Sequence, residues 1–148
     1  AAAEEAGGRA WEPPDPGALA RPLADLPALF GALRERGRRI AVATTDDRAP
    51  TERTLAALGI APFVDALVCA DDGLPVKPAP DMVRHLCRTL DVEPSRCAVV
   101  GDSPADLAMG RAAGAGLVVG VLSGVGSRAD LEPLADLLLP SIADLHPG

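Results

Sequence analysis

The chain lacks a cysteine framework, a long hydrophobic run and a block of basic residues. Its three cysteines form no CxxC pair, which favours buried, reduced thiols over a set of disulfides and indicates a cytoplasmic location. The longest weakly polar run, "AGAGLVVGVLSGVG", is too short and too rich in glycine to cross a bilayer. No signal peptide is recognisable at the start of the sequence.

The charge balance excludes two classes of partner. The formal net charge is −7, and an acidic domain without a clustered Lys/Arg block is a poor candidate for binding nucleic acid or an anionic membrane. Arginines gather only at Arg34, Arg36, Arg38 and Arg39. They lie at the end of a predicted helix, where cations interact favourably with the helix dipole, so no ligand is needed to explain them.

The 148 residues are enough for one domain with one core. Residues 1–22 are dense in Ala, Gly and Pro, and we expect a poorly ordered linker or the remnant of another element there. Residues 23–148 are expected to form the folded domain. Because the sequence starts at Ala1 rather than Met, we expect a processed chain or part of a longer one.

Hydrophobic periodicity alternates regularly between two types along the folded part. Helices are predicted over 23–37, 50–59, 79–90, 104–114 and 127–134. Short apolar runs predict strands over 39–44, 65–70, 96–101, 116–122 and 135–141, and "SIADL" could start one more turn. This alternation predicts an α/β fold with a parallel sheet covered on both faces, so ligands should bind beyond the carboxyl ends of the strands.

Two aspartates, Asp102 and Asp106, follow the strand predicted over 96–101. Ser103-Pro104 with an acidic residue three positions after the serine is an ordinary helix start, which explains Asp106 but not Asp102. Two carboxylates this close repel unless one is protonated or a cation lies between them. Mg²⁺ would suit such a pair, and the spacing alone leaves a metal site and a helix cap equally open.

Two further strand ends carry polar residues. Thr44 ends a strand, where threonine commonly closes a turn but can also direct its hydroxyl at an anion. Lys77 lies in "GLPVKPAP", where two prolines restrict the backbone and thereby fix where the lysine points. Lysine is often used beside a phosphate, and a solvated loop lysine is the alternative.

Taken together and in this order, these segments resemble a known family. Thr44 after "IAVA", Lys77 in "VKPAPD" and the segment "VVGDSPADL" resemble the second, third and fourth motifs of haloacid dehalogenase-like (HAD) phosphohydrolases. The similarity extends over roughly 23–146, and the pattern is nearest to phosphoglycolate phosphatase-like members. The resemblance implies a three-layer, Rossmann-like core with a parallel sheet.

The resemblance also implies roles for individual residues. Thr44 and Thr45 would bind a phosphoryl group, Lys77 would steady the charge of nucleophile and phosphate, and Asp102 and Asp106 would hold Mg²⁺. The substrate would be a small phosphorylated metabolite. The implied reaction is Mg²⁺-dependent hydrolysis of a phosphomonoester through an aspartyl-phosphate.

The family's first motif, a strand ending in DxDxT that supplies the nucleophilic aspartate, is not found. Asp15 and Asp25 lie upstream of Thr44, but neither follows an apolar strand and neither has an aspartate two residues on. The pairs Asp46-Asp47 and Asp71-Asp72 also lack that context, so we do not expect either to replace the nucleophile.

The absence has structural and functional consequences. The first-motif strand belongs at the centre of the sheet, so the strands over 39–44 and 96–101 must pair directly, leave a gap or accept a strand from elsewhere. We therefore expect self-association or a strand donor at the open edge.

The chain is expected to be a hydrolase by resemblance but inactive in isolation. A pseudophosphatase that binds a phosphorylated ligand or a partner protein is the alternative. Residues 1–22 would be the remnant of the substrate-selecting cap, so the substrate itself is not predicted.

Overall fold

A computed structural model describes residues 25–145. The linker predicted over 1–22 lies outside the described residues. The helices are α2 (Leu26–Glu35), α3 (Arg48–Ala57), α4 (Asp81–Leu90), α5 (Pro104–Ala113) and α6 (Arg128–Leu131). The strands are β1 (Ala41–Ala43), β2 (Ala66–Val68), β3 (Ala98–Gly101), β4 (Leu117–Val121) and β5 (Leu137–Leu139). Single turns of 3₁₀-helix are η3 (Ala61–Phe63), η4 (Ala70–Asp72), η5 (Pro94–Arg96) and η6 (Ile142–Asp144).

The predicted order of helices and strands is confirmed. Most elements are shorter than predicted by a few residues, whereas α3 begins two residues earlier than predicted and also ends two residues earlier. Apolar spacing explains α4, which buries five side chains on one face: Met82, Val83, Leu86, Cys87 and Leu90. Glycine sets the end of α5, because Gly114 adopts φ +82°, a conformation that a side chain would strain.

The strands form two parallel sheets rather than one. β1 pairs with β2, and β3, β4 and β5 form a second sheet in that order. Among the described strands, β1 and β3 do not pair, although both come from segments predicted to flank the missing strand. Of the three arrangements that the sequence left open, the described part of the chain therefore has a gap in the hydrogen-bond ladder.

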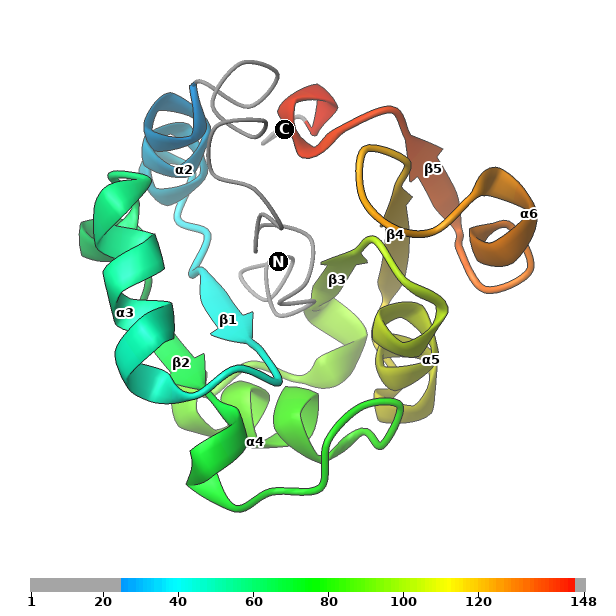
Figure 1. Ribbon diagram of the computed structural model, residues 1–148, viewed down its shortest axis with the longest axis horizontal. Helices are drawn as coiled ribbons and strands as arrows, with labels where there is room; N and C mark the ends of the chain where they lie inside the picture. Colours follow the sequence, from blue (N-terminus) through cyan, green and yellow to red (C-terminus); the bar gives the residue numbers. More distant parts are fainter. Residues whose placement is uncertain (1–24, 146–148) are drawn as a thin grey trace.

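The two sheets nevertheless share one core with helices on both faces (Figure 1). On one face α4 and α5 pack on Ala41, Val68 and Val99, which come from both sheets. On the other face α2 and α3 pack on Val42 and Val100, again from both sheets. The three-layer, Rossmann-like α/β fold is confirmed.

The cysteines and the helix lengths agree with the sequence. Cys69, Cys87 and Cys97 are all buried, and none of them forms a disulfide within the described residues. Within residues 25–145, none of the helices has the length and apolar character needed to cross a bilayer.

Candidate active site

The carboxyl edges of the two sheets meet through an ion pair. Lys77, in the loop between β2 and α4, contacts Asp106, in the first turn of α5 after β3. Both side chains are buried, at 7% and 0% exposure. A buried pair whose members come from different sheets fixes the loop after β2 against the start of α5.

Asp106 uses both of its carboxylate oxygens in the protein. Oδ1 contacts the Lys77 ammonium, and Oδ2 accepts a hydrogen bond from the Asp102 backbone N–H at 3.2 Å. Burial raises the pKa of Asp106 to about 6, even though Lys77 favours the charged form. Lys77 is thus the cation that offsets one of the two neighbouring carboxylates.

The start of α5 places Asp106 at this point. Ser103 is the N-cap, its Oγ accepts from the Asp106 N–H at 3.3 Å, and Pro104 takes the first helical position. A Cβ on Gly101 would lie 2.3 Å from the Asp106 Cβ. Only glycine therefore allows the end of β3 to approach this carboxylate so closely.

Asp102 has different surroundings from Asp106. Its side chain is 6% exposed, and Oδ2 accepts from the Val125 backbone N–H at 3.2 Å. Oδ1 is buried and has no hydrogen-bond partner in the part of the chain that the structure describes. An unpartnered carboxylate oxygen is costly to bury and is the kind of hard ligand that Mg²⁺ takes, so the residue fits a metal ligand.

The loop after β4 encloses Asp102, and the sequence did not single out its residues. A Cβ on Gly124 would lie 1.9 Å from Asp102 Oδ2. The Gly126 N–H donates to the Asp102 carbonyl at 2.8 Å. The segment "SGVGS" is the only sequence signal for this role, and it reads as an ordinary turn until the contact with Asp102 is known.

Thr44 directly follows β1 and is fully buried. Its N–H donates to the Val68 carbonyl at 3.0 Å, and its Oγ1 accepts from the Asp46 N–H at 3.0 Å. Thr45 follows in the same bend and is half-buried. Because β1 and β2 are parallel and the loop after β2 carries Lys77 to Asp106, Thr44 lies at the same edge as the acidic pair.

The pair Asp71-Asp72 holds two segments of the chain together. Asp72 accepts from Arg48 Nη2 at 2.7 Å and from the Cys69 N–H at 2.8 Å. The hydrogen bond from Cys69 is the main reason that the pKa of Asp72 is lowered. Asp71 accepts from the Arg48 N–H at 3.0 Å. The two carboxylates therefore join η4 to the start of α3.

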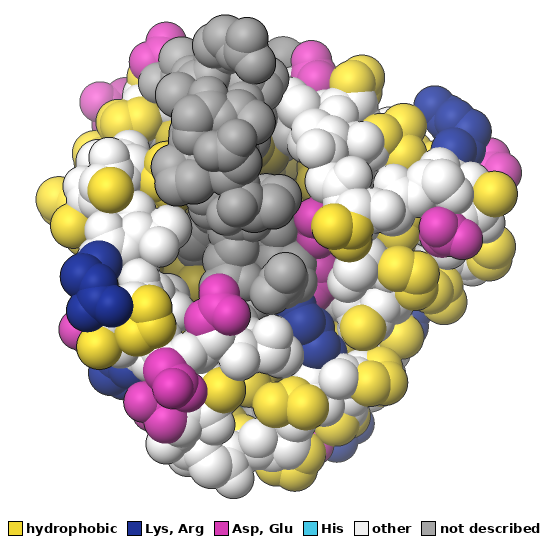
Figure 2. Space-filling view, in the orientation of Figure 1, with side chains coloured by type: hydrophobic (Ala, Val, Ile, Leu, Met, Phe, Trp, Pro, Cys, Tyr) yellow, Lys and Arg dark blue, Asp and Glu magenta, His cyan; other side chains and the backbone are white. Residues whose placement is uncertain are grey.

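The charges on the described part of the face seen in Figure 2 are interspersed, and neither sign forms a continuous patch.

Asp46 and Asp47, the other pair considered as a nucleophile, are exposed in the turn after β1. Among the described residues, no group of three or more His, Cys, Asp or Glu side chains could hold a metal. A cation at this edge would therefore have one or two carboxylate ligands, as Mg²⁺ commonly does.

The haloacid dehalogenase-like hydrolase family profile matches residues 16–114. The chain therefore belongs to the haloacid dehalogenase-like hydrolases.

Curated relatives specify the subgroup. A phosphoglycolate phosphatase of Cupriavidus necator is 38% identical over 98 residues, which is 66% of this chain and 42% of that protein. A phosphoglycolate phosphatase of Rhodospirillum rubrum is 40% identical over 106 residues, which is 72% of this chain and 44% of that protein. The chain is thus phosphoglycolate phosphatase-like, and it spans less than half the length of these two relatives.

Solved structures agree with the fold. A predicted phosphoglycolate phosphatase from Haemophilus somnus superposes with a TM-score of 0.74 at 25% identity, over 81% of this chain and 53% of that one. CbbY from Rhodobacter sphaeroides was solved with xylulose-1,5-bisphosphate. It superposes with a TM-score of 0.69 at 31% identity, over 81% of this chain and 54% of that one. The two-sheet core therefore corresponds to part of a larger fold in both structures.

Proposed function

We propose that this chain forms the phosphate-binding and Mg²⁺-binding part of a phosphomonoesterase. The observation that carries the proposal is the buried, unpartnered Oδ1 of Asp102 beside the buried Lys77–Asp106 pair, at the carboxyl edge of the sheets. A carboxylate ligand and an ammonium group at one strand edge are the two charges needed to hold a phosphate dianion with its cation.

Each residue has a distinct part in this proposal. Asp102 would bind Mg²⁺ directly, because its Oδ1 is not used by the described protein groups. Asp106 would hold Lys77 in place and reach the metal only through water, because both of its oxygens already have partners. Thr44 and Thr45 would donate to a phosphoryl oxygen, and Lys77 would stabilise the charge on that group. Bound Mg²⁺ would supply charge neutralisation between an anionic nucleophile and the anionic substrate.

The nucleophile is the missing part. Attack by a carboxylate oxygen on phosphorus forms an aspartyl-phosphate and releases the alcohol, and water then cleaves the acyl phosphate. The sequence has no apolar strand ending in DxDxT before Thr44, and the gap between β1 and β3 lies where that strand is expected. We therefore propose that the isolated chain is inactive and that a strand donor or a second copy can occupy the open edge.

The substrate class follows from the relatives. Two of them are named phosphoglycolate phosphatases, and a solved neighbour holds a sugar bisphosphate. We propose a small phosphorylated metabolite in the cytoplasm, with 2-phosphoglycolate as the first compound to test.

The test compares this 148-residue chain with the polypeptide that its native host produces, characterised by intact mass and N-terminal sequence. Both are assayed on p-nitrophenyl phosphate and 2-phosphoglycolate, with Mg²⁺ or with EDTA. We expect Mg²⁺-dependent turnover only from a longer host polypeptide with a strand ending in DxDxT, and loss of that turnover in Asp102→Asn. Turnover by the isolated chain, lost in Asp102→Asn, would contradict the proposed inactivity.

A host polypeptide that starts at or near Ala1 would favour the alternative of a pseudophosphatase. Its retained Thr44, Lys77 and Asp102 would then bind a phosphorylated ligand or a partner without turnover. That alternative predicts phosphate or Mg²⁺ binding by a stable, monodisperse chain, and aggregation of the chain would count against it.

A further inference from the structure

Four large apolar side chains are exposed among the described residues, and two of them flank the candidate active site. They are Val76, Leu117, Val125 and Leu137, at 46%, 38%, 67% and 44% exposure. Leu117 and Leu137 begin β4 and β5, so they lie at the amino edge of the sheet. Val76 and Val125 lie in the loops after β2 and β4, at the carboxyl edge that carries Asp102.

The loop after β4 holds Val125 beside Asp102. The Val125 N–H donates to Asp102 Oδ2 at 3.2 Å, and the Gly126 N–H donates to the Asp102 carbonyl at 2.8 Å. A Cβ on Gly124 would lie 1.9 Å from Asp102 Oδ2, and one on Gly126 would lie 2.7 Å from the Asp102 carbonyl oxygen. Because both neighbouring glycines press their backbone on Asp102, the isopropyl group of Val125 is the side chain that this stretch presents to solvent.

The loop after β2 holds Val76 beside Lys77. The Val76 carbonyl accepts from the Ala79 N–H at 3.1 Å, which closes a turn that contains Lys77. Lys77 contacts Asp106, and Asp106 Oδ2 accepts from the Asp102 N–H at 3.2 Å. The two exposed valines are therefore carried by the two loops that also border the acidic pair.

We propose that Val76 and Val125 are specificity-determining residues, which contact the ester group of the phosphomonoester and favour an uncharged, apolar one. This inference rests on the proposed phosphate and Mg²⁺ site. With the phosphoryl group held between Lys77 and a cation on Asp102, the ester carbon extends out of a site that these two loops border. Carbon atoms of the ester group that cover the valines remove apolar surface from water. A charged ester group would lose water at the same place and gain no polar partner from either side chain.

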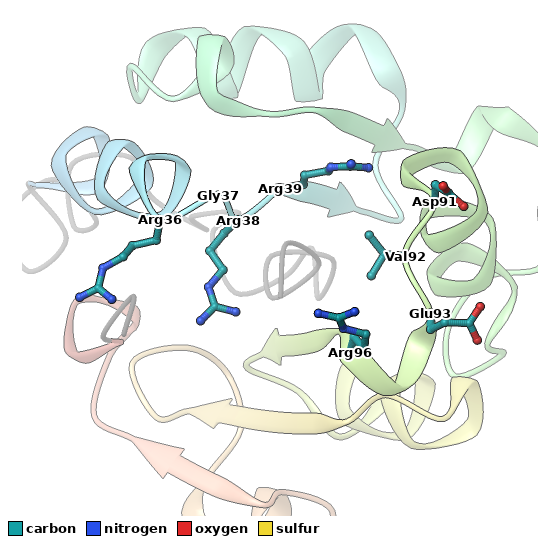
Figure 3. Close-up of a pocket in the computed structure, with 8 residues that line it drawn as sticks. All are labelled: Arg36, Gly37, Arg38, Arg39, Asp91, Val92, Glu93 and Arg96. Carbon is teal, nitrogen blue, oxygen red and sulfur yellow. The ribbon is translucent and has the colours of Figure 1, made fainter.

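The pocket at the opposite, amino edge has a different lining. Its volume is about 550 Å³, and it lies between the turn that joins α2 to β1 and the segment from the end of α4 to η5 (Figure 3). Six of its eight lining residues carry charge: Arg36, Arg38, Arg39, Asp91, Glu93 and Arg96. An apolar ester group gains little from such a lining, so the preference is expected at the carboxyl edge.

The test is a calorimetric titration of the whole chain with inorganic phosphate, phenyl phosphate and 2-phosphoglycolate. Each titration is made with Mg²⁺ and again in EDTA, so that binding independent of the metal is subtracted. The readout is the ratio of affinities within one protein. We expect the wild type to bind phenyl phosphate at least about fivefold more tightly than either other ligand.

The test variant is Val76→Ser/Val125→Ser, in which the advantage of phenyl phosphate should fall below about twofold. The matched control is Leu117→Ser/Leu137→Ser, which removes the two exposed apolar side chains of the amino edge and should keep the advantage. Mg²⁺-dependent phosphate binding without an advantage for phenyl phosphate, or an equal loss in both double variants, would overturn this inference alone. No Mg²⁺-dependent binding of any ligand would overturn the proposed function as well.

A second measurement needs no variant to fold. In wild type with ¹³C-labelled valine and leucine methyl groups, the phenyl protons of bound phenyl phosphate should give nuclear Overhauser effects to the methyl groups of Val76 and Val125. Those of Leu117 and Leu137 should give none. Effects to the two leucines instead, or to neither valine, would contradict the proposal.

Discussion

At the residue scale, Asp102 and Asp106 lie four positions apart but have different partners. Asp106 is neutralised by Lys77 and packs on Gly101, whereas Asp102 keeps one oxygen without a protein partner in the described chain. The sequence indicated a cation for the pair. It did not indicate that a lysine 29 residues away would supply the charge for one member, because that contact depends on how the loop after β2 folds back.

The first prediction concerns Gly124. In Gly124→Ala the new Cβ would clash with the Asp102 carboxylate, so the side chain or the loop must shift. We expect a loss of about 1–3 kcal/mol in the free energy of unfolding, measured by urea denaturation, and weaker Mg²⁺ binding measured by calorimetry.

Gly31→Ala is the matched control, because its Cβ would meet only the Phe63 ring at 3.6 Å, an ordinary contact. Replacing this glycine inside α2 should raise the free energy of unfolding by about 0.5–1 kcal/mol. Equal stability of Gly124→Ala and the wild type would mean that Gly124 does not position Asp102.

The second prediction concerns pH. The pKa of Asp106 is raised to about 6 by burial, so between about pH 4 and pH 6 the folded state binds more protons than the unfolded state. Stability should therefore fall as pH rises through that window, by at most about 1.4 kcal/mol per pH unit from this group. Urea denaturation in chelator across pH 4–7 measures the slope, and Asp106→Asn should remove it.

Asp136 contributes to stability with the opposite dependence on pH, and Asp136→Asn removes that contribution. A hydrogen bond from the Val118 N–H is the main reason that the pKa of Asp136 is lowered, and Arg111 lowers it further. Its contribution to stability is present above the usual aspartate pKa of about 3.9 and is lost below it, outside the window of Asp106. If the free energy of unfolding of Asp106→Asn still fell between pH 4 and pH 6, Asp106 would not be the group responsible for that fall.

At the scale of elements, the alternation of apolar runs was enough to predict the described helices and strands in order. The signals were local: the amphipathic face of α4, the Ser103-Pro104 start of α5 and the glycine after it. What the sequence could not show was contact between elements. The need for glycine in the loop after β4 can be explained only once Asp102 is known to lie against that loop.

The third prediction tests how α5 positions the acidic pair. Ser103→Ala removes the acceptor for the Asp106 N–H at the start of α5. We expect a loss of about 1 kcal/mol in the free energy of unfolding and weaker Mg²⁺-dependent phosphate binding. Ser95→Ala, an exposed serine in η5, is the control and should change neither quantity. A loss of the same size in both variants would exclude a specific capping role.

At the scale of the whole molecule, one core holds two sheets whose neighbouring strands do not pair in the described residues. The sequence predicted this arrangement as one of three, because the family resemblance placed a strand between β1 and β3 that the sequence does not supply. Local patterns could not choose between them, since pairing depends on distant segments. The chain covers less than half of the two phosphoglycolate phosphatases, so we expect the proposed site to be one part of what a full hydrolase needs.

The most direct measurement is calorimetric titration of the isolated chain with inorganic phosphate, in the presence of Mg²⁺ and again in EDTA. We expect phosphate binding that requires Mg²⁺, is lost in Asp102→Asn, and is unchanged in Asp130→Asn, whose carboxylate caps α6 in the described structure. Phosphate binding that is indifferent to Mg²⁺ and to Asp102→Asn, or no binding under either condition, would contradict the claim that Thr44, Lys77, Asp102 and Asp106 form a metal-assisted phosphate site.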